Sequence, residues 1–580
     1  MRLLYFLFLF FALPIGAFKI LIYQTILSQS HLHFSGVLTD VLTERGHTVD
    51  NLLMEWNPRV IGNGTNKARR IIRVREKNVT AFERTQQSAN KMHKMDLPLS
   101  HKCFQDTRLN LCKALLSERP MIEELKNVKY DVGLATMHDS CGFGIFKLID
   151  IPTTVGYSPT AEGFGMRDLF GIPTPPSFVP DVEDPEIQGD QLTFFQRIKT
   201  FYRSLRSEGK MSQLNKPMKK LFREYYPEFP SVNDLERNMT FVLVNSHEVL
   251  NVPKPTSAKV KHIGGIAVQK PKPSQKVSPG IEKVLARSPA GVVLLSFGTY
   301  SKNLLTLKVK REIASSFKHF PQYTFLWNSE DPDEDLSFYN QMPNLYRSKS
   351  LPIDRLIFDN RVKAFISNGG QQSYMEASVA GVPQLIIPQF ADQFYTAACV
   401  ERNGQGLRLS KSNVTEKSMT GALTEMLYNK KYEKQSRRLS LIMQNYPEQP
   451  RDTLIKYVEL AAQYPELGQH LQLASARMNW FHYSSADVIL FLIFGLIALV
   501  ALTILIFQLP RYLIDKSKER DYSYKQPRRH DEHSRHGTEA REVPPARKES
   551  IHKEITHVEN APNKPLEETP VHETEKDKDI

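Results

Sequence analysis

Cysteine is scarce in this chain: its 580 residues include four, Cys103, Cys112, Cys141 and Cys399. So few cysteines exclude a disulfide framework as the basis of the fold. Their spacing also matches no zinc-binding pattern, so no metal site is predicted. A pairing of Cys103 with Cys112 as a staple of one loop stays open, because cysteine positions alone do not fix connectivity. With 41% hydrophobic residues the chain must form ordinary cores, and its length predicts several domains.

Acidic residues are absent between Glu248 and Glu282, while lysines and prolines are frequent there. This composition predicts an interdomain linker over residues 251–290. Its charge could favour an anionic ligand, but a solvated basic linker explains it equally well. The net charge of +13 is otherwise spread widely, and no zinc-finger, homeodomain or RNA-binding pattern is present. The sequence therefore predicts no nucleic-acid partner.

Charge is also missing from Val488 to Phe507, 20 residues rich in leucine, isoleucine, valine and phenylalanine. At 1.5 Å per residue this run matches a hydrocarbon core of about 30 Å, so a transmembrane helix is predicted over residues 488–507. Arg511, Lys516 and Lys518 follow it and place that side in the cytosol by the positive-inside rule. A single-pass, type I topology follows.

The amino terminus predicts entry into the secretory pathway. Arg2 precedes the apolar run Leu3 to Leu13, which is too short to span a bilayer, and small residues follow at Gly16-Ala17. Residues 1–17 are therefore predicted to be a signal peptide. Sequons for N-glycosylation agree with a lumenal location. They lie at Asn63, Asn78, Asn238 and Asn413.

The cytosolic tail is predicted over residues 508–580, and from Lys516 on it is highly charged and almost lacks aromatics. Such a segment buries too little apolar surface to order itself, so a disordered cytosolic tail is predicted. Its last five residues run from Lys576 to Ile580 and resemble a dilysine retrieval signal of the endoplasmic reticulum. The predicted location is the endoplasmic reticulum membrane, with the bulk of the chain in the lumen.

Between these ends, strand-like and helix-like patterns alternate in two halves. The pattern predicts parallel sheets covered by helices on both faces, with ligands at the carboxyl ends of the strands. A helix after the first strand shows apolar residues at i, i+3, i+4, i+7 and i+8 from Phe34 to Leu42. Two Rossmann-like α/β domains facing a cleft are predicted. The strands are expected at 18–26, 132–135, 152–157, 240–244, 292–298, 323–327, 362–367 and 384–387.

The stretch Phe365 to Gly406 carries the clearest chemistry. A strand runs into Asn368-Gly369-Gly370 at the start of a helix, where backbone N–H groups can meet a phosphate. Glu376 lies further along that helix and can accept hydrogen bonds from a ribose. Asp392-Gln393 follows the next strand and can hold sugar hydroxyls. Together these residues predict a pocket for a nucleotide sugar.

The array Glu376-Ala377, Gly381-Val382-Pro383, Pro388 and Asp392-Gln393 resembles the signature of the UDP-glycosyltransferase family, specifically of animal UDP-glucuronosyltransferases. The resemblance covers roughly residues 18 to 510. It implies the GT-B fold, with an acceptor-binding domain over 18–250 and a UDP-sugar-binding domain with return helices over 291–487. It implies transfer of a sugar from UDP-glucuronic acid or UDP-glucose to a small lipophilic acceptor, with inversion and a role in detoxification. No metal or redox cofactor is implied, and oligomers with itself or with relatives stay open.

The resemblance also assigns roles to residues. His31 in Ser30-His31 matches the family's catalytic base, which a neutral imidazole can be. The family's acid that holds this base falls on Thr136, and Asp139 is the nearest substitute. The hydroxyls of Ser296 and Thr299, on either side of Gly298, are expected at the pyrophosphate. The predicted donor-binding residues are Ser296, Gly298, Thr299, Asn368, Gly369, Gly370, Ser373, Glu376, Asp392 and Gln393.

Several donor-site positions depart from the family's pattern. Ser350 stands where a tryptophan packs on the uracil, and Ile353 replaces a glutamine that reads its edge. Asn368 replaces a phosphate-contacting histidine and cannot supply positive charge. Gln372 is bulkier than the family's residue. Two hypotheses therefore stand: an active glycosyltransferase, or a catalytically impaired, membrane-anchored relative that binds ligands or partners.

Overall fold

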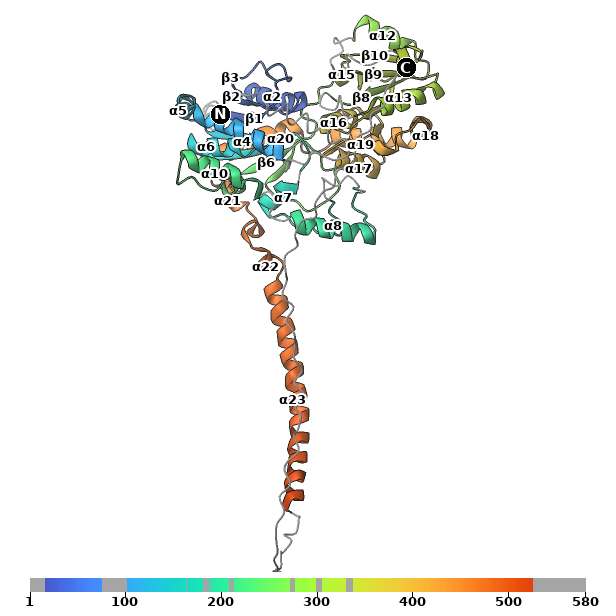
Figure 1. The fold of residues 1–580 in the computed structure, drawn as a ribbon. Coiled ribbons are helices and arrows are strands. Elements are labelled where there is room, and N and C mark those ends of the chain that lie inside the picture. Colours follow the sequence, from blue (N-terminus) through green and yellow to red (C-terminus); the bar gives the residue numbers. More distant parts are fainter. Residues whose placement is uncertain are drawn as a thin grey trace, which may run out of the picture. The chain divides into compact units, whose positions relative to one another are not determined.

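The computed structural model describes residues 16–75, 102–162, 164–180, 187, 189–207, 213–271, 277–298, 305–329 and 337–524. The chain divides into two compact units, Met1–Asp487 and Val488–Ile580. In the described part of the first unit, two parallel sheets with flanking helices form two lobes (Figure 1). The predicted signal peptide falls almost wholly outside the described residues, as do Asn78 and the tail from residue 525.

The first lobe contains a sheet in the order β3-β2-β1-β4-β5-β6-β7, with every neighbouring pair parallel. Its strands are β1 (Lys19–Thr25), β2 (Thr48–Glu55), β3 (Arg70–Arg75), β4 (Val132–Thr136), β5 (Thr153–Ser158), β6 (Phe241–Val244) and β7 (Val260–His262). Its helices are α2 (Gln29–Glu44), α4 (Lys102–Ser117), α5 (Arg119–Val128), α6 (Cys141–Leu148), α7 (Phe164–Phe170), α8 (Phe194–Ser207), α10 (Lys216–Tyr225) and α11 (Val232–Arg237).

The second lobe repeats this plan with a parallel sheet in the order β10-β9-β8-β11-β12-β13. Its strands are β8 (Val292–Ser296), β9 (Thr324–Asn328), β10 (Leu345–Ser348), β11 (Val362–Ser367), β12 (Gln384–Ile386) and β13 (Gly406–Arg408). Its helices are α12 (Pro279–Ala286), α13 (Leu307–Ser316), η1 (Phe317–His319), α14 (Ser337–Asn340), α15 (Ile353–Leu356), α16 (Gln371–Ala380), α17 (Gln393–Arg402), η2 (Lys411–Asn413), α18 (Glu416–Tyr428) and α19 (Lys431–Gln444).

The central strands bury side chains on both faces, as a parallel sheet between helix layers requires. In β1, Leu21 and Tyr23 join one hydrophobic core, while Ile20 and Ile22 join the core on the other face. The predicted stripe of α2 packs into that second core. In β8 the same alternation separates Val293 from Val292. The order of strands and helices confirms the predicted α/β fold.

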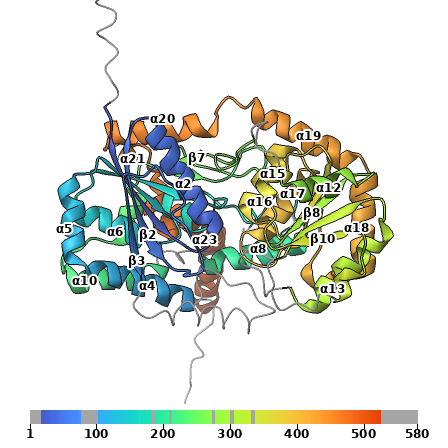
Figure 2. The same cartoon turned by 90° about the horizontal axis from the view of Figure 1, so that it is seen from above.

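The chain returns from the second lobe to the first through α20 (Pro450–Gln463). Leu454, Val458 and Ala461 of this helix pack into the core on the α2 side of the first sheet, where α20 lies beside α2 (Figure 2). Arg45 after α2 donates to Glu459 at 2.8 Å. Short segments follow: α21 (Leu467–His470), η3 (Ala474–Arg477) and α22 (Trp480–Tyr483). The return helix α20 therefore completes the first lobe after the chain has passed through the second.

The predicted linker contains more structure than its composition indicated. Its residues include β7, the edge strand of the first sheet, and α12, whose Ile281 and Leu285 pack in the second lobe. Lys259 is fully buried, and its ammonium donates to the carbonyls of Arg237 and Met239 and to Gln472. Burial lowers the pKa of this lysine to about 8. The short strand escaped the sequence pattern because Lys261, and Lys259 just before it, resemble solvated linker residues.

We expect Lys259→Met to lower the free energy of unfolding by about 2–4 kcal/mol, because it leaves buried acceptors without a donor while keeping the volume. The control is Lys270→Met at an exposed lysine of the same segment, which we expect to be neutral. Thermal unfolding of the full chain in detergent measures both. Equal midpoints for the two variants would contradict a structural role for the buried ammonium.

The structure decides the cysteine pairing that the sequence left open. Cys112 in α4 forms a disulfide with Cys141 at the start of α6, so the candidate pairing of Cys112 with Cys103 is wrong. The partner is 29 residues away in sequence, because parallel-sheet topology brings helices from separate crossovers onto one face. Cys399 is a buried free thiol. Three of the sequon asparagines, Asn63, Asn238 and Asn413, are exposed, so their glycosylation stays a prediction that the fold permits.

The second unit is dominated by α23 (Ala486–Tyr524), which starts at the unit boundary and contains the predicted span. Among the described residues this is the helix long and apolar enough to cross a membrane, with a mean hydropathy of 3.2 over its most apolar window. It continues past residue 507, so residues 516–524 of the segment predicted to be disordered are helical. Extending a formed helix costs little compared with nucleating one, and Lys516, Lys518 and Arg520 are good helix formers.

Candidate active site

The two lobes of the first unit share a cavity of about 530 Å³ at the carboxyl ends of their strands. This is the edge of a parallel sheet at which ligands are expected. From the first lobe it is lined by Leu27, Ser28, Gln29, Ser30, His31, Trp56, Phe104, His138, Pro159, Thr160 and Asn245. From the second lobe it is lined by Ser296, Gly298, Asn328, Leu351, Ile353, Asp354, Asn368, Gly370, Gln371, Gln372, Ser373, Glu376, Phe390, Ala391, Asp392 and Gln393.

His31 lies in the first turn of α2, directly beyond the end of β1. Ser28 caps this helix and accepts a hydrogen bond from the His31 backbone N–H at 3.4 Å. The imidazole is partly buried, and its Nδ1 atom has no hydrogen-bond partner. Burial, with a smaller effect of His138, lowers the pKa of His31 to about 3. The imidazole is therefore neutral at neutral pH, the form in which it can accept a proton.

His138 was not predicted, yet its ring lies beside that of the candidate base. It follows β4, and its ring centroid lies 5.2 Å from that of His31. Its Nδ1 is 3.3 Å from the Thr136 hydroxyl, the position that the family fills with an acid. Burial lowers the pKa of His138 to about 4. A second neutral imidazole thus occupies the region where a carboxylate was expected.

Asp139 does not make the contact predicted for it. Its carboxylate accepts hydrogen bonds from the Tyr23 hydroxyl at 2.7 Å and the Thr25 hydroxyl at 2.9 Å. The backbone N–H of Cys141 donates to its other oxygen at 3.0 Å. The residue is fully buried and does not line the cavity. The carboxylate therefore joins β1 to the start of α6 instead of holding His31, because these neighbouring donors satisfy it.

We expect His138→Gln to flatten the loss of stability in acid. The pKa of His138 is about 4 in the folded chain and about 6.5 in an unfolded one. Its neutral form is therefore favoured by folding, and stability falls as the pH drops below 6.5 toward 4. The variant should recover about 2 kcal/mol at pH 4.5 relative to the parent. Thermal unfolding midpoints between pH 7 and 4.5 measure this, with exposed His33→Gln as the control; parallel curves for all three proteins would contradict it.

On the second lobe, the predicted glycine loop Asn368-Gly369-Gly370 forms hydrogen bonds within itself and with the neighbouring strand ends. Asn368 donates from its amide to the Phe297 carbonyl at 2.9 Å and accepts from the Gly370 N–H at 3.2 Å. The Gly369 N–H donates to the Ser367 hydroxyl at 3.1 Å. Gly369 has a φ of +79°, and a Cβ there would lie 2.7 Å from Ile386. Both glycine N–H groups are thus engaged within the loop and do not point freely into the cavity.

That helix, α16, begins without any side-chain cap, since its N-cap residue is Gly370. Its first-turn residues Gln371, Gln372 and Ser373 line the cavity, and the N–H groups of a first turn form the positive end of the helix dipole. Glu376 stands one turn further on and accepts from the Gln372 amide at 3.0 Å. Burial raises the pKa of Glu376 to about 7. The predicted ribose acceptor is therefore held in place by the glutamine that departs from the family's pattern.

Asp392 and Gln393 stand where α17 begins. Ala391 before them has a φ of +52°, a conformation that costs energy for a residue with a side chain and that turns the chain into the cavity. The Gln393 amide oxygen accepts from the backbone N–H groups of Gln389 and Phe390. Burial raises the pKa of Asp392 to about 6. Gln393 thus orders the loop, while the Asp392 carboxylate stays ionised at neutral pH.

The remaining predicted donor-binding residues differ in whether they line the cavity. Ser296 and Gly298 line the cavity at the end of β8, while Thr299 lies outside the described residues. Ser350 is exposed and does not line it, whereas Ile353 does. The sequence also missed an apolar wall on the first-lobe side, where the rings of Trp56 and Phe104 pack at 4.5 Å. Nothing in the sequence indicated this pair, because β2 was not recognised as a strand.

The carboxyl groups that line the cavity face no lysine or arginine among the described lining residues. They belong to Asp354, Glu376 and Asp392. Lys254, a candidate partner for a sugar carboxylate, is buried beside Glu162, with Nζ 3.5 Å from Oε2. Its ammonium also lies 5.3 Å from the centre of the Tyr395 ring. The described walls therefore offer no cationic side chain to an anionic ligand group.

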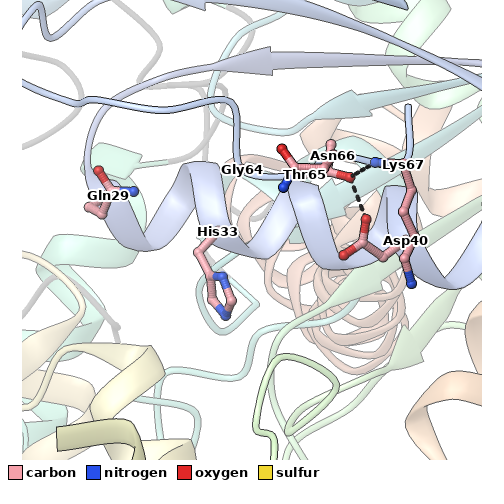
Figure 3. A pocket seen from close by; sticks show the side chains of 7 residues that line it. All are labelled: Gln29, His33, Asp40, Gly64, Thr65, Asn66 and Lys67. Carbon is pink, nitrogen blue, oxygen red and sulfur yellow. Dashed lines mark hydrogen bonds between the residues drawn. The ribbon is translucent and has the colours of Figure 1, made fainter. Parts of the chain in front are cut away.

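A second hollow lies on another side of α2 (Figure 3). His33 lines this hollow, whereas His31 lines the cavity between the lobes. His33 is exposed there, two residues and about 200° around the helix from His31. The Thr65 hydroxyl donates to Asp40 and accepts from the Lys67 N–H at 2.9 Å. These groups satisfy one another, and His33 does not line the shared cavity.

A sequence profile of the family described as "UDP-glucoronosyl and UDP-glucosyl transferase" matches residues 24–520. The chain belongs to this family. A Caenorhabditis elegans protein named as a UDP-glucuronosyltransferase is 26% identical over 485 residues, covering 82% of this chain and 92% of that protein. The mouse UDP-glucuronosyltransferase 2B17 is 28% identical over 393 residues, covering 67% and 72% of the two chains. The human 2-hydroxyacylsphingosine 1-beta-galactosyltransferase is 27% identical over 502 residues, covering 85% and 88%.

Solved structures of glycosyltransferases share the fold. The glycosyltransferase of kitacinnamycin superposes with a TM-score of 0.54 at 16% identity, over 77% of this chain and 98% of that one. The Os79 protein of O. sativa gives 0.52 at 17% identity, over 77% and 100%. The expected GT-B architecture of two facing Rossmann-like lobes is confirmed, and the family membership makes the chain a glycosyltransferase of the UDP-sugar-dependent type.

Proposed function

We propose that this glycosyltransferase moves a hexose from a UDP-sugar to a hydroxyl of a small lipophilic acceptor, with inversion at the anomeric carbon. One observation carries the proposal: a single cavity joins the neutral imidazole of His31 to the uncapped start of α16, Glu376 and Asp392. The base thus stands on one lobe and the donor groups on the other. That arrangement allows an acceptor hydroxyl to meet the donor sugar from the side opposite the leaving phosphate.

The steps follow from these positions. His31 takes the proton of the acceptor hydroxyl as the oxygen attacks the anomeric carbon. The bond from that carbon to the diphosphate breaks, and UDP leaves with the electron pair. The N–H groups at the start of α16 stabilise the charge that develops on the diphosphate. Glu376 orients the ribose, Asp392 orients the sugar hydroxyls, and no metal or redox cofactor takes part in this proposal.

The acceptor side supports a lipophilic substrate. Leu27, Trp56, Phe104 and Phe390 line the cavity beside His31 and His138. Such a wall stabilises an apolar ligand by removing its surface from water, at roughly 25 cal/mol per Å². The only polar group that a substrate needs there is the hydroxyl that His31 deprotonates.

For the donor we propose a neutral hexose, glucose or galactose, in preference to glucuronate. The carboxyl groups of Asp354, Glu376 and Asp392 line the cavity, the described lining includes no lysine or arginine, and Lys254 is engaged by Glu162. A sugar carboxylate would therefore meet like charge. The human relative is named for galactosyl transfer. Assays of the full chain with UDP-glucose, UDP-galactose and UDP-glucuronic acid test this preference. Turnover with UDP-glucuronic acid alone would overturn the neutral donor while leaving the glycosyltransferase intact.

The proposed setting is the endoplasmic reticulum membrane, with α23 as a single type I span and the cavity in the lumen. The disulfide between Cys112 and Cys141 supports an oxidising compartment. Exposed sequons at Asn63, Asn238 and Asn413 agree with it. In microsomes, we expect an endoglycosidase-sensitive chain whose bulk resists added protease until detergent is present. Cleavage of the bulk in sealed microsomes would reverse the topology.

A catalytically impaired binder is the second candidate, and two observations favour it. Ile353 lines the donor side where the family reads the uracil, and both glycine N–H groups of the loop are engaged within it. UDP release with a mixed panel of phenols and sterols separates the candidates. Release by the parent chain supports an enzyme. No release, together with calorimetric binding of UDP to the purified full chain, supports the binder.

A further inference from the structure

The surroundings of His138 decide which of its ring nitrogens carries the proton. Its Nδ1 atom lies 3.3 Å from the hydroxyl of Thr136, a residue that is fully buried. The described residues contain no other partner for this hydroxyl. If the hydroxyl accepted a hydrogen bond from Nδ1, its own O–H would be buried with nothing to donate to, which is unfavourable. The hydroxyl therefore donates to Nδ1, and the proton of the neutral ring resides on Nε2.

The Nε2–H group is what His138 can offer to a ligand. The ring lines the cavity between the lobes. Its Nδ1 is occupied by Thr136, and within the described part of the chain Nε2 has no hydrogen-bond partner. Burial lowers the pKa of His138 to about 4, so the ring is neutral near pH 7. The cavity wall thus contains a neutral N–H donor whose position is fixed by a buried hydroxyl.

This donor stands beside the candidate base. The ring centroids of His31 and His138 are 5.2 Å apart, with the ring planes inclined by 43°, and both rings line the cavity. The Nδ1 atom of His31 is buried without a partner, so Nε2 is the atom with which this base can reach an acceptor. At this spacing a single oxygen atom can lie within hydrogen-bonding distance of one nitrogen from each ring.

An attacking hydroxyl has three groups to direct: one proton and two lone pairs. In the mechanism proposed above the proton goes to His31, and one lone pair forms the bond to the anomeric carbon of the donor sugar. The second lone pair can accept a hydrogen bond. Negative charge grows on this oxygen as its proton leaves, and a preorganised N–H donor placed there stabilises that charge. It also fixes the rotation of the hydroxyl, so that the attacking lone pair faces the donor.

We propose that His138 donates a hydrogen bond from Nε2 to the acceptor oxygen while His31 removes the proton of that same oxygen. This role deepens the proposed function and rests on it. His138 keeps its own proton throughout, so the transfer still exchanges one proton and one glycosyl group. Thr136 is a positioning residue, because its hydroxyl sets the tautomer of His138. The family's acid would stabilise the imidazolium, whereas His138 stabilises the oxygen that the proton has left.

The test compares two acceptors of different acidity, with UDP release by the full chain in detergent as the measurement. A sterol alcohol is a weak acid and depends on stabilisation of its oxygen, while 4-nitrophenol forms its oxyanion readily. His138→Leu removes the donor and keeps an apolar side chain. His138→Gln keeps an N–H donor that cannot take up a proton at neutral pH. Thr136→Val removes the hydroxyl and keeps the shape, and His33→Leu at an exposed imidazole is the control.

We expect His138→Leu to lower kcat by about 10² with the sterol and by less than about tenfold with 4-nitrophenol. His138→Gln should restore most of the sterol rate. Thr136→Val should lower the sterol rate several-fold, because the tautomer of His138 is then no longer fixed. His33→Leu should keep the rates of the parent. Calorimetry should give the same affinity for UDP in every variant, which shows that each is folded.

Equal losses with the two acceptors would overturn the proposal, because a packing role of His138 affects both alike. An unchanged sterol rate in His138→Leu would overturn it as well. So would a His138→Gln variant as slow as His138→Leu, since the ring would then act by taking up a proton. Should His138→Leu fail to bind UDP, Thr136→Val decides by the same comparison of acceptors. No release by the parent chain with any acceptor would refute the proposed function, and this inference with it.

Discussion

His31→Ala should lower kcat by about 10²–10⁴, the contribution of a positioned general base. KM for the acceptor should change little, because the apolar wall of Trp56 and Phe104 supplies most of its binding surface. UDP release with the best acceptor of the panel measures both quantities. The physical reason is that an alcohol cannot lose its proton near neutral pH without an acceptor group beside it. The residual rate would come from the donor groups of the second lobe alone.

The matched control is His33→Ala, which removes an exposed imidazole two residues away on another side of α2. Its rate should stay within about twofold of the parent. Calorimetry with UDP should give the same affinity for the parent and for His31→Ala, since the donor lobe is untouched. Equal rates for the parent and His31→Ala at saturating substrates would refute the assigned base.

The base should also work at unusually low pH and with modest strength. Its pKa of about 3 keeps it neutral across the physiological range, and His138 supplies no negative charge to stabilise the imidazolium. A carboxylate in that place would do so, but Asp139 is held by Tyr23 and Thr25. We therefore expect the rate of the parent to show no acid limb from His31 between pH 5 and 8.

The sequence was sufficient for the architecture because the buried parallel strands are its most regular signals. β1 and β4 of the first sheet and β8 and β11 of the second are near-continuous apolar runs, and the two sheets could be predicted without contacts. The short strands β7, β10 and β13 carry lysine, arginine or glycine and were missed, because their positions depend on neighbours in the sheet and not on their own pattern. The helical start of the predicted tail was missed because composition does not reveal how far a long helix propagates.

In the site, local motifs were predictable and their partners were not. The positions of His31, Glu376 and Asp392 follow from strand ends and helix starts, which a sequence reveals. Whether Asp139 turns toward His31 or toward Tyr23 depends on donors 114 and 116 residues away in the chain. His138 could have been noticed only from its place after an apolar strand, a weak signal for one residue. Cavity membership is a property of two lobes together, so the role of Trp56 required the fold.

Asp392→Ala should lower kcat/KM for the UDP-sugar by about 10², while the affinity for UDP itself stays within about twofold. A hydrogen bond to a charged acceptor is worth roughly 1.5–3 kcal/mol, and each 1.4 kcal/mol is tenfold. Asp392 is placed for this by Ala391 in its left-handed conformation and by the loop that Gln393 closes. UDP lacks the sugar that the carboxylate is proposed to hold, so its binding should not depend on this group.

Asp392→Asn is the matched control, because it keeps an oxygen acceptor of the same size and loses the charge. It should retain more activity than the alanine variant and should lose the rise in rate that the parent shows as the pH increases through about 6, the pKa of Asp392. Gln393→Ala is different in kind, since it frees two backbone N–H groups and should weaken binding of UDP and UDP-sugar alike. If Asp392→Ala weakened UDP as much as the UDP-sugar, the carboxylate would support the loop and not the sugar, and the hexose would have to be held from the side of Asn328 and Asp354.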